Sequence, residues 1–310
     1  MKIAIIGQQD FGKAVLEAFV ARGDEVAGVF CAPEKEGAKP DPLKVAAEEK
    51  GLRVFQFASL KGTEATTAMR GLDADIGVMA FVLQFAPREF VSIPKRGMIQ
   101  YHPSLLPKFR GPSSINWQII KGEAKTGLTI FRPTDGLDEG PVILQKETPV
   151  SENDTLGSVY FDRLFPMGVQ AMLEAADLVL AGRQREVAQD ESLASYEGWC
   201  RAAEAKVNWA NHADFIHNVI RGCDPAPGAW TTLGAKKLQL FGSRKHLVRT
   251  FGAVKGKTGE VTEVGAEAIR VAAQSGQIEL AKVKPEDGKK VPAADWARAA
   301  GVSPGTILGT

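Results

Sequence analysis

Cysteine is scarce in this sequence. Three of the 310 residues are Cys, they lie far apart, and no two of them form a Cys-x-x-Cys pair. An odd number of scattered cysteines argues against a disulfide framework and against a zinc knuckle. His212 and His217 are five residues apart, which is not the spacing that places two metal ligands on one helix face. We therefore expect a reducing, cytoplasmic setting and no metal site.

A long apolar run is also absent. The first apolar stretch, Lys2 to Ile6, ends at Gly7. It is too short for the apolar part of a signal peptide or for a membrane span. We therefore interpret it as a buried first strand and expect no membrane partner.

The chain has no excess of one charge, because its net charge is +1. The charges are unevenly distributed, however. Residues 205–310 contain 15 Lys and Arg against 9 Asp and Glu, a difference of +6, so the remainder has −5. A basic C-terminal part permits a polyanionic partner such as tRNA without requiring one.

The glycine pattern of a dinucleotide-binding turn is incomplete. Gly7 and Gly12 give G-x4-G, without the G-x-G that lets a pyrophosphate approach the backbone at a helix N-terminus. Packing of the first helix on the sheet explains both glycines. We expect no NAD(P) site in this chain.

Strand-like and helix-like segments alternate from the N-terminus, which is typical of parallel βαβ units. We expect strands at 3–6, 25–31, 53–57, 76–80 and 98–101, and helices at 12–22, 42–50, 63–71 and 87–93. The order predicts an α/β fold with a doubly wound, mostly parallel sheet.

The pattern of predicted elements changes in the second half of the chain. A helical region from Asp154 to Ala181 is expected to bend or split at Pro166. The polar stretch 182–205 is typical of a linker. Beyond it, short β-prone runs separated by Gly turns predict a small antiparallel barrel, at 229–233, 237–241, 259–264, 268–272 and 277–283. We therefore expect domains at 1–181 and 206–310, joined by a linker at 182–205.

The stretch Gln100 to Gly111 is the centre of the first domain. The strand ending there places His102 at its C-terminal end, and Pro103 bars continuation of the ladder. In an open α/β sheet, ligands bind at this edge. A histidine at a strand end is also compatible with a purely structural, hydrogen-bonded role.

A second polar loop, Pro133 to Gly140, lies between two further strand-like runs, 128–132 and 142–145. It contains Asp135 and Asp138, and solvated turn chemistry is one explanation for both. The other is that His102 and an aspartate on a neighbouring strand-end loop form an acid/base pair.

Three motifs together resemble the formyltransferase family that uses 10-formyltetrahydrofolate. They are His102-Pro103-Ser104-Leu105-Leu106-Pro107, Arg110-Gly111 and Asp135-Gly136-Leu137-Asp138-Glu139-Gly140. Asp138 follows His102 by 36 residues (138 − 102), as in the family. Within the family, the chain is most similar to the N-terminal hydrolase domain of 10-formyltetrahydrofolate dehydrogenase, and next to methionyl-tRNA formyltransferase.

The resemblance implies a Rossmann-like formyl-transfer domain and an OB-like C-terminal β-barrel. It also implies folate-binding residues, in a loop that holds the pterin and in the wall beside the formyl group: Gln84, Phe85 and Ala86, and Ser104, Leu105, Leu106 and Pro107. The catalytic residues would be His102, Asp138 and Gln100. Where the transferases have Asn and the hydrolase domain has an aliphatic residue, this chain has Gln100, which shares a strand face with His102.

Three functions remain open from the sequence. The first is hydrolysis of 10-formyltetrahydrofolate to formate and tetrahydrofolate, with His102 and Gln100 as donors to the oxyanion and Asp138 as base. The second is transfer of the formyl group to an amine, most plausibly methionyl-tRNA. The third is a non-enzymatic folate-binding module. The sequence does not indicate an oligomeric state.

Overall fold

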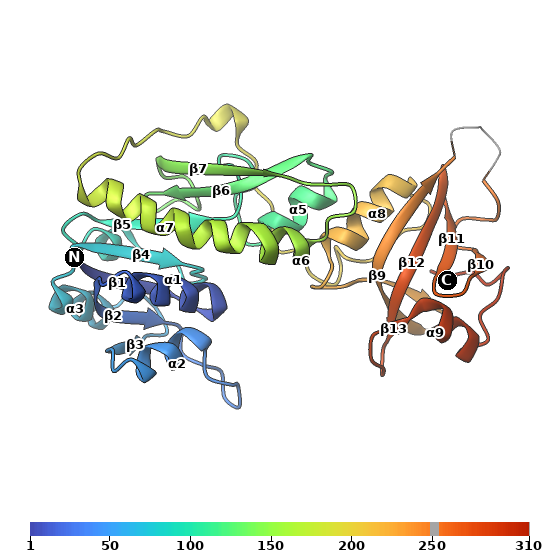
Figure 1. Ribbon diagram of the computed structural model, residues 1–310, viewed down its shortest axis with the longest axis horizontal. Helices are drawn as coiled ribbons and strands as arrows, with labels where there is room; N and C mark the ends of the chain where they lie inside the picture. Colours follow the sequence, from blue (N-terminus) through green and yellow to red (C-terminus); the bar gives the residue numbers. More distant parts are fainter. Residues whose placement is uncertain (249–253, 310) are drawn as a thin grey trace. The chain divides into compact units, whose positions relative to one another are not determined.

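The computed structural model describes residues 1–248 and 254–309. The chain divides into two compact units (Figure 1). The first comprises Met1–Pro112, Thr126–Thr148 and Phe161–Glu197, and the second comprises Ser113–Lys125, Pro149–Tyr160 and Gly198–Thr310. The domain limits expected from the sequence, with a linker at 182–205, stay predictions, and residues 182–197 lie with the first unit.

The first unit alternates strands and helices. Its elements are β1 (Lys2–Gly7), α1 (Gln9–Ala21), β2 (Glu25–Cys31), α2 (Pro42–Glu49), β3 (Val54–Gln56), α3 (Thr63–Leu72), β4 (Ile76–Ala80), α4 (Arg88–Val91), β5 (Met98–His102), β6 (Lys125–Phe131), β7 (Val142–Pro149) and α7 (Phe165–Leu180).

Within the described residues, the sheet of this unit has seven strands in the order β3-β2-β1-β4-β5-β6-β7. The ladders from β3 to β5 are parallel, and β6 pairs antiparallel with β5. The chain adds β2 and β3 on one side of β1 and then β4 and β5 on the other, which is a doubly wound arrangement. The predicted mostly parallel α/β sheet is confirmed.

Strand β1 is apolar at consecutive positions because helices cover both faces of the sheet. Ile3 and Ile5 belong to a core with side chains of α1, α2 and α7, whereas Ala4 and Ile6 belong to a core with α3 and α4. Figure 1 shows α1 and α7 lying along the sheet. Successive side chains of a strand point to opposite faces, so one short strand contributes to both cores.

Two ladders hold the strand that ends at His102. β5 pairs with β4 on one side, and on the other side His102 lies opposite Thr129 of β6. Pro103 cannot donate to a ladder, so the strand ends there. The imidazole is thereby placed at the C-terminal edge of a rigid sheet.

The helical region before residue 181 is split, as Pro166 predicted. It consists of α6 (Leu156–Val159), a π-helical turn (Tyr160–Leu164) and α7, with Pro166 in the first turn of α7. Proline lacks a backbone N–H and is tolerated where a helix begins, so a new helix starts at this point. No helix within residues 1–248 and 254–309 is long and apolar enough to cross a membrane.

The second unit is built on an antiparallel sheet. Besides α6, its elements are α5 (Ser114–Ile120), α8 (Ala213–Gly222), β8 (Ala229–Leu233), β9 (Lys236–Leu247), β10 (Val261–Val264), β11 (Ile269–Ala273), β12 (Gly276–Pro285), β13 (Val291–Pro292) and α9 (Ala293–Ala299).

Among the described residues, the second sheet is ordered β10-β11-β12-β9-β8, with β13 beside β12. All of its ladders are antiparallel, as the sequence predicted. The segment 305–309 joins the two edge strands. Val261 N donates to Thr306 O at 2.7 Å on the β10 side, and Gly309 N donates to Thr232 O at 2.8 Å on the β8 side. This bridge is the contact by which a sheet of this order closes toward a barrel.

The buried side chain of His217 on α8 is expected to make the stability of this unit depend on pH. Its side chain is buried, with Nδ1 2.8 Å from Ser243 Oγ and Nε2 donating to Glu152 O at 3.0 Å. Burial lowers the pKa of His217 below its ordinary value of 6.5. The unfolded chain therefore takes up a proton at His217 at a higher pH than the folded chain, so the free energy of unfolding decreases as pH falls below about 6.5.

The measurement is urea unfolding of the wild type and of His217→Gln between pH 5 and pH 8. The expected result is that the wild-type midpoint falls more steeply toward low pH than that of the variant, which retains a donor for the Glu152 carbonyl. If the urea midpoint depends on pH in the same way in the two proteins, His217 is not the group responsible for the pH dependence.

Candidate active site

His102 is oriented by a backbone carbonyl. The side chain is 7% exposed, and its Nε2 lies 2.8 Å from Phe109 O. A carbonyl oxygen only accepts hydrogen bonds, so Nε2 bears the hydrogen and donates it. This bond leaves Nδ1 as the ring nitrogen that does not contact Phe109 O.

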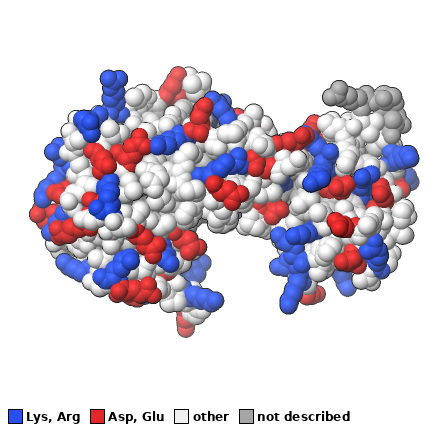
Figure 2. Space-filling view, viewed as in Figure 1, with Lys and Arg blue, Asp and Glu red and all other residues white. Residues whose placement is uncertain are grey.

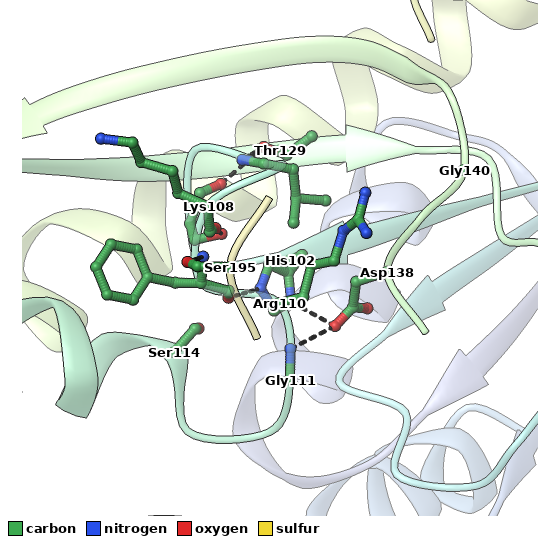
Figure 3. A network of polar contacts seen from close by, with 12 residues as sticks. His102, Lys108, Arg110, Gly111, Ser114, Thr129, Asp138, Gly140 and Ser195 are labelled. Atoms are coloured by element: carbon green, nitrogen blue, oxygen red, sulfur yellow. Dashed lines mark hydrogen bonds and ion pairs between the residues drawn. The ribbon is translucent and has the colours of Figure 1, made fainter. Parts of the chain in front are cut away.

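Asp138 lies on the other side of the ring. Its side chain is 6% exposed, and its Oδ2 is 3.5 Å from His102 Nδ1 and accepts a hydrogen bond from Gly111 N at 2.9 Å (Figure 3). Gly111 has φ +104°, and a Cβ there would lie 2.2 Å from Glu197 O. Only glycine fits this position, where its N–H can reach the carboxylate.

The facing atoms define what the pair does chemically. Nε2 of His102 already donates to Phe109 O, so Nδ1 is the ring nitrogen that faces Asp138 Oδ2, at 3.5 Å. Such a pair can take up one proton and release it again. The two loops that the sequence predicted to be neighbours do bring these two side chains together.

Asp138 also faces a cavity of about 220 Å³ at the C-terminal edge of the sheet. The cavity is lined by Met79, Val82, Leu83, Gln84, Phe85, Ala86, Gln100, Phe131, Pro133, Thr134, Asp135, Gly136, Leu137 and Asp138. Five residues that the sequence singled out are therefore in its wall, which are Gln84, Phe85, Ala86, Gln100 and Asp138. His102 is not in the wall of the cavity. Asp138 is in the wall, and its Oδ2 also lies near His102 Nδ1 and Gly111 N.

The rim of this cavity is unusually apolar. Leu83, Phe85 and Leu137 are 52%, 48% and 51% exposed. Large apolar side chains exposed together beside a cavity indicate a binding site for a flat, partly apolar ligand. Gln84 fixes the loop that presents two of them, because its Nε2 donates to Phe57 O at 2.8 Å.

Ser104, Leu105, Leu106 and Pro107 are not in the wall of the cavity. The bonds of this segment run within its own loop, to β6 and β7, and to the stretch 182–197. Ser104 Oγ donates to Lys108 O at 2.6 Å, and Thr129 Oγ1 donates to Ser104 O at 2.7 Å. Gln145 Nε2 donates to Leu106 O at 2.8 Å, and Ser195 N donates to Pro107 O at 3.2 Å. Thr129 Oγ1 also accepts from Leu106 N at 3.1 Å. The segment thus holds the loop between His102 and Phe109 in place, and its predicted contact with folate stays a prediction.

Sequence reasoning missed the contribution of the stretch 182–197. Ser195 Oγ accepts from Phe109 N at 2.8 Å, and Ser195 O accepts from Arg110 N at 2.9 Å. The guanidinium of Arg110 is buried and bonds to Gln189 and Glu191 (Figure 3 shows Arg110 and Ser195 beside the pair). The hydrogen bonds from Arg110 lower the pKa of Glu191. A polar composition gave no signal for these contacts, because it is equally typical of a solvated linker.

Among residues 1–248 and 254–309, no three His, Cys, Asp or Glu side chains are grouped so that they could hold a metal ion. The polar groups at the site include the His102–Asp138 pair and the Gln100 amide, and the rim of the cavity is apolar.

Comparison with known families gives two matches. A formyl transferase profile matches residues 1–176, and a formyl transferase C-terminal domain profile matches residues 200–301. The matched segments correspond to the α/β part and the antiparallel part of the chain.

Two kinds of enzyme are among the curated relatives of this chain. Cytosolic 10-formyltetrahydrofolate dehydrogenase from Xenopus tropicalis is 38% identical over 97% of this chain and 34% of its own length. Mitochondrial 10-formyltetrahydrofolate dehydrogenase from Mus musculus is 38% identical over 96% of this chain. The chain thus spans about a third of the length of these relatives. Methionyl-tRNA formyltransferase from Geotalea uraniireducens is 32% identical over all of this chain and 98% of its own length.

Solved structures share the fold. HypX from Aquifex aeolicus in complex with tetrahydrofolic acid has a TM-score of 0.68 and 19% identity, covering 96% of this chain and 47% of HypX. WlaRD, a sugar 3N-formyl transferase, has a TM-score of 0.70 and 18% identity, covering 93% of this chain and 99% of WlaRD. At these identities the likeness concerns the fold alone.

Proposed function

This chain belongs to the formyl transferase family of enzymes, and on that premise we propose that it removes the formyl group from 10-formyltetrahydrofolate with His102 and Asp138 as its acid/base pair. The observation that supports this most is the place of Asp138, which lines the cavity and whose Oδ2 lies 3.5 Å from Nδ1 of His102. A base in that position takes the proton from an attacking water or amine, and the imidazole on its far side stabilises the charges that result.

The cavity supports a folate as the ligand. Its volume of about 220 Å³ is below the range of about 300 Å³ and more that holds a whole drug-sized ligand. A flat bicyclic pterin would enter, with the exposed side chains of Leu83, Phe85 and Leu137 against its faces, and the remainder of the folate would lie outside. Among proteins of this fold, HypX was solved in complex with tetrahydrofolic acid and WlaRD in the presence of 5-N-formyl-THF.

Gln100 is proposed to donate to the oxyanion that forms on the formyl oxygen. It lines the cavity, and no hydrogen bond of its amide to another described side chain or carbonyl is present in residues 1–248 and 254–309. Gln100→Leu keeps the size and removes the donor, so kcat is expected to fall by about 10²- to 10³-fold with little change in KM. Gln100→Asn, which keeps an amide, should retain more activity than Gln100→Leu. Equal turnover of Gln100→Leu and wild type would exclude this role.

The acceptor of the formyl group decides between hydrolysis and transfer. The test is to incubate the protein with 10-formyltetrahydrofolate labelled in the formyl carbon, with and without charged initiator tRNA, and to follow the label. Label in formate without tRNA supports hydrolysis, which we propose. Label on the methionyl group supports transfer. Label that stays on folate in both samples would leave a folate-binding module.

Methionyl-tRNA is the second candidate acceptor. It is favoured by the match to a methionyl-tRNA formyltransferase over nearly the full length of that enzyme. It is also favoured by the net charge of +6 on residues 205–310. Figure 2 shows Lys and Arg side chains interspersed with Asp and Glu on the face drawn, so the excess does not form one uninterrupted patch there. Binding through phosphates would weaken steeply as salt is raised. If the protein does not bind tRNA, or if its binding of tRNA does not change with salt concentration, this candidate is removed.

A further inference from the structure

One side chain joins the two loops that hold the His102–Asp138 pair. Nε2 of Gln189 donates to Asp138 O at 2.7 Å and to Gly140 O at 2.8 Å. Its Oε1 accepts from Arg110 Nη2 at 2.8 Å and from Arg110 Nε at 3.2 Å. A primary amide has two hydrogens to donate and two lone pairs to accept with, so all four hydrogen-bonding positions of Gln189 are used.

The partners of Gln189 are the backbone positions that matter for the pair. Arg110 lies between Phe109, whose carbonyl orients His102, and Gly111, whose N–H binds the Asp138 carboxylate. On the other loop, Gln189 binds the carbonyl of Asp138 itself. A shift of either loop would therefore change the separation of Nδ1 and Oδ2, which is 3.5 Å.

The conformation of Asp138 makes such a tie necessary. Its φ is +57°, in the left-handed region that residues other than glycine adopt at a cost, and which persists when the surroundings hold it. Gly140, two residues further on, is constrained by space, since a Cβ there would lie 1.6 Å from Arg132 O. The hydrogen bonds of Gln189 to the carbonyls of both residues hold this turn.

We propose that Gln189 is a positioning residue for the reaction, which fixes the distance and orientation of Asp138 relative to His102 without touching the substrate. This inference rests on the proposed function, because it assumes that the pair is the acid/base machinery. Gln189 lies outside the wall of the cavity, so its effect is on the chemical step and not on folate binding.

Gln189→Glu is the sharpest variant. Glutamate keeps the size and the acceptor for Arg110, but it places a carboxylate oxygen against the carbonyls of Asp138 and Gly140 in place of two N–H donors. The expected result is a decrease in kcat on the order of 10- to 100-fold with KM for 10-formyltetrahydrofolate within about twofold. Gln189→Met removes the bonds without the repulsion, and it carries the same test if Gln189→Glu does not fold.

Glu191→Gln is the matched control. Glu191 is on the same stretch and binds Arg110 through both carboxylate oxygens, at 2.7 Å and 2.9 Å, but its side chain is 66% exposed. Glu191→Gln keeps an acceptor for Arg110, so we expect kcat within about threefold of wild type. An equal loss of kcat in the Gln189 and Glu191 variants would overturn the proposal, because the effect would then belong to the attachment of the whole stretch.

A second measurement does not need turnover. The ¹⁵N chemical shifts of the His102 ring, assigned by difference from His102→Gln, report whether Nδ1 shares a proton with a carboxylate. We expect them to change in Gln189→Glu and in Gln189→Met, and to stay unchanged in Glu191→Gln. Wild-type kcat and wild-type His102 shifts in the Gln189 variants would overturn the proposal. If Asp138→Asn keeps full turnover, the proposed function itself fails, and the shifts alone then decide whether Gln189 positions the ring.

Discussion

Asp138→Asn is expected to lower kcat for the release of formate from 10-formyltetrahydrofolate by about 10²- to 10⁴-fold. The amide cannot accept the proton of the attacking nucleophile, and it cannot share a proton with His102 Nδ1. KM should change little, because Asn keeps the size of the side chain that lines the cavity. Steady-state measurement of formate release at saturating folate gives the result directly.

The variant isolates the charge because the rest of the site tolerates Asn. Asp138 has φ +57°, and Asn is among the residues that adopt this conformation most readily. The Asn oxygen can still accept from Gly111 N. The matched control is Asp73→Asn, since Asp73 also has a positive φ of 49° but lies exposed at the end of α3, away from the cavity. Wild-type turnover of Asp138→Asn, or an equal loss in Asp73→Asn, would contradict the role of Asp138.

His102→Gln is expected to lower kcat by about 100-fold or more. The Gln amide can take over the donation to Phe109 O, so the loop keeps its carbonyl bond, but nothing then faces Asp138 Oδ2 that can hold or release a proton. His246→Gln is the control, because His246 is an exposed histidine of the other unit paired with Glu279. The two histidine variants are compared by formate release across pH.

The losses of kcat in Asp138→Asn and His102→Gln are also expected to be non-additive. Under the proposal, His102 and Asp138 serve the same proton-transfer step, so removing either group disables it, and the double variant should lose hardly more activity than the more damaged single variant. Losses that multiply in the double variant would show that the two residues act independently.

The local chemistry of the sequence was sufficient for much of the fold. Consecutive apolar residues at Ile3 to Ile6 predicted a strand covered on both faces, and Pro166 predicted the split before α7. The helix expected at 42–50 is α2, whose start is capped by Asp41 accepting from Leu43 N at 2.9 Å. These features depend on neighbouring residues, because caps, breaks and burial patterns act over one or two turns. The residue types of the pair could be singled out for the same reason, since a strand end and a glycine-rich loop mark where ligands bind.

Distances across the chain were beyond such reasoning. The 3.5 Å between His102 and Asp138, the choice of Nε2 as the fixed donor and the presence of Asp138 in the cavity wall depend on how β5, β6 and their loops pack. No pattern in the sequence indicated the role of Gln189, because its hydrogen-bonding partners lie 49 to 79 residues away and the stretch that contains it is typical of a linker. Composition and spacing are local properties of the chain. Hydrogen bonds between distant segments exist only once the sheet has brought those segments together.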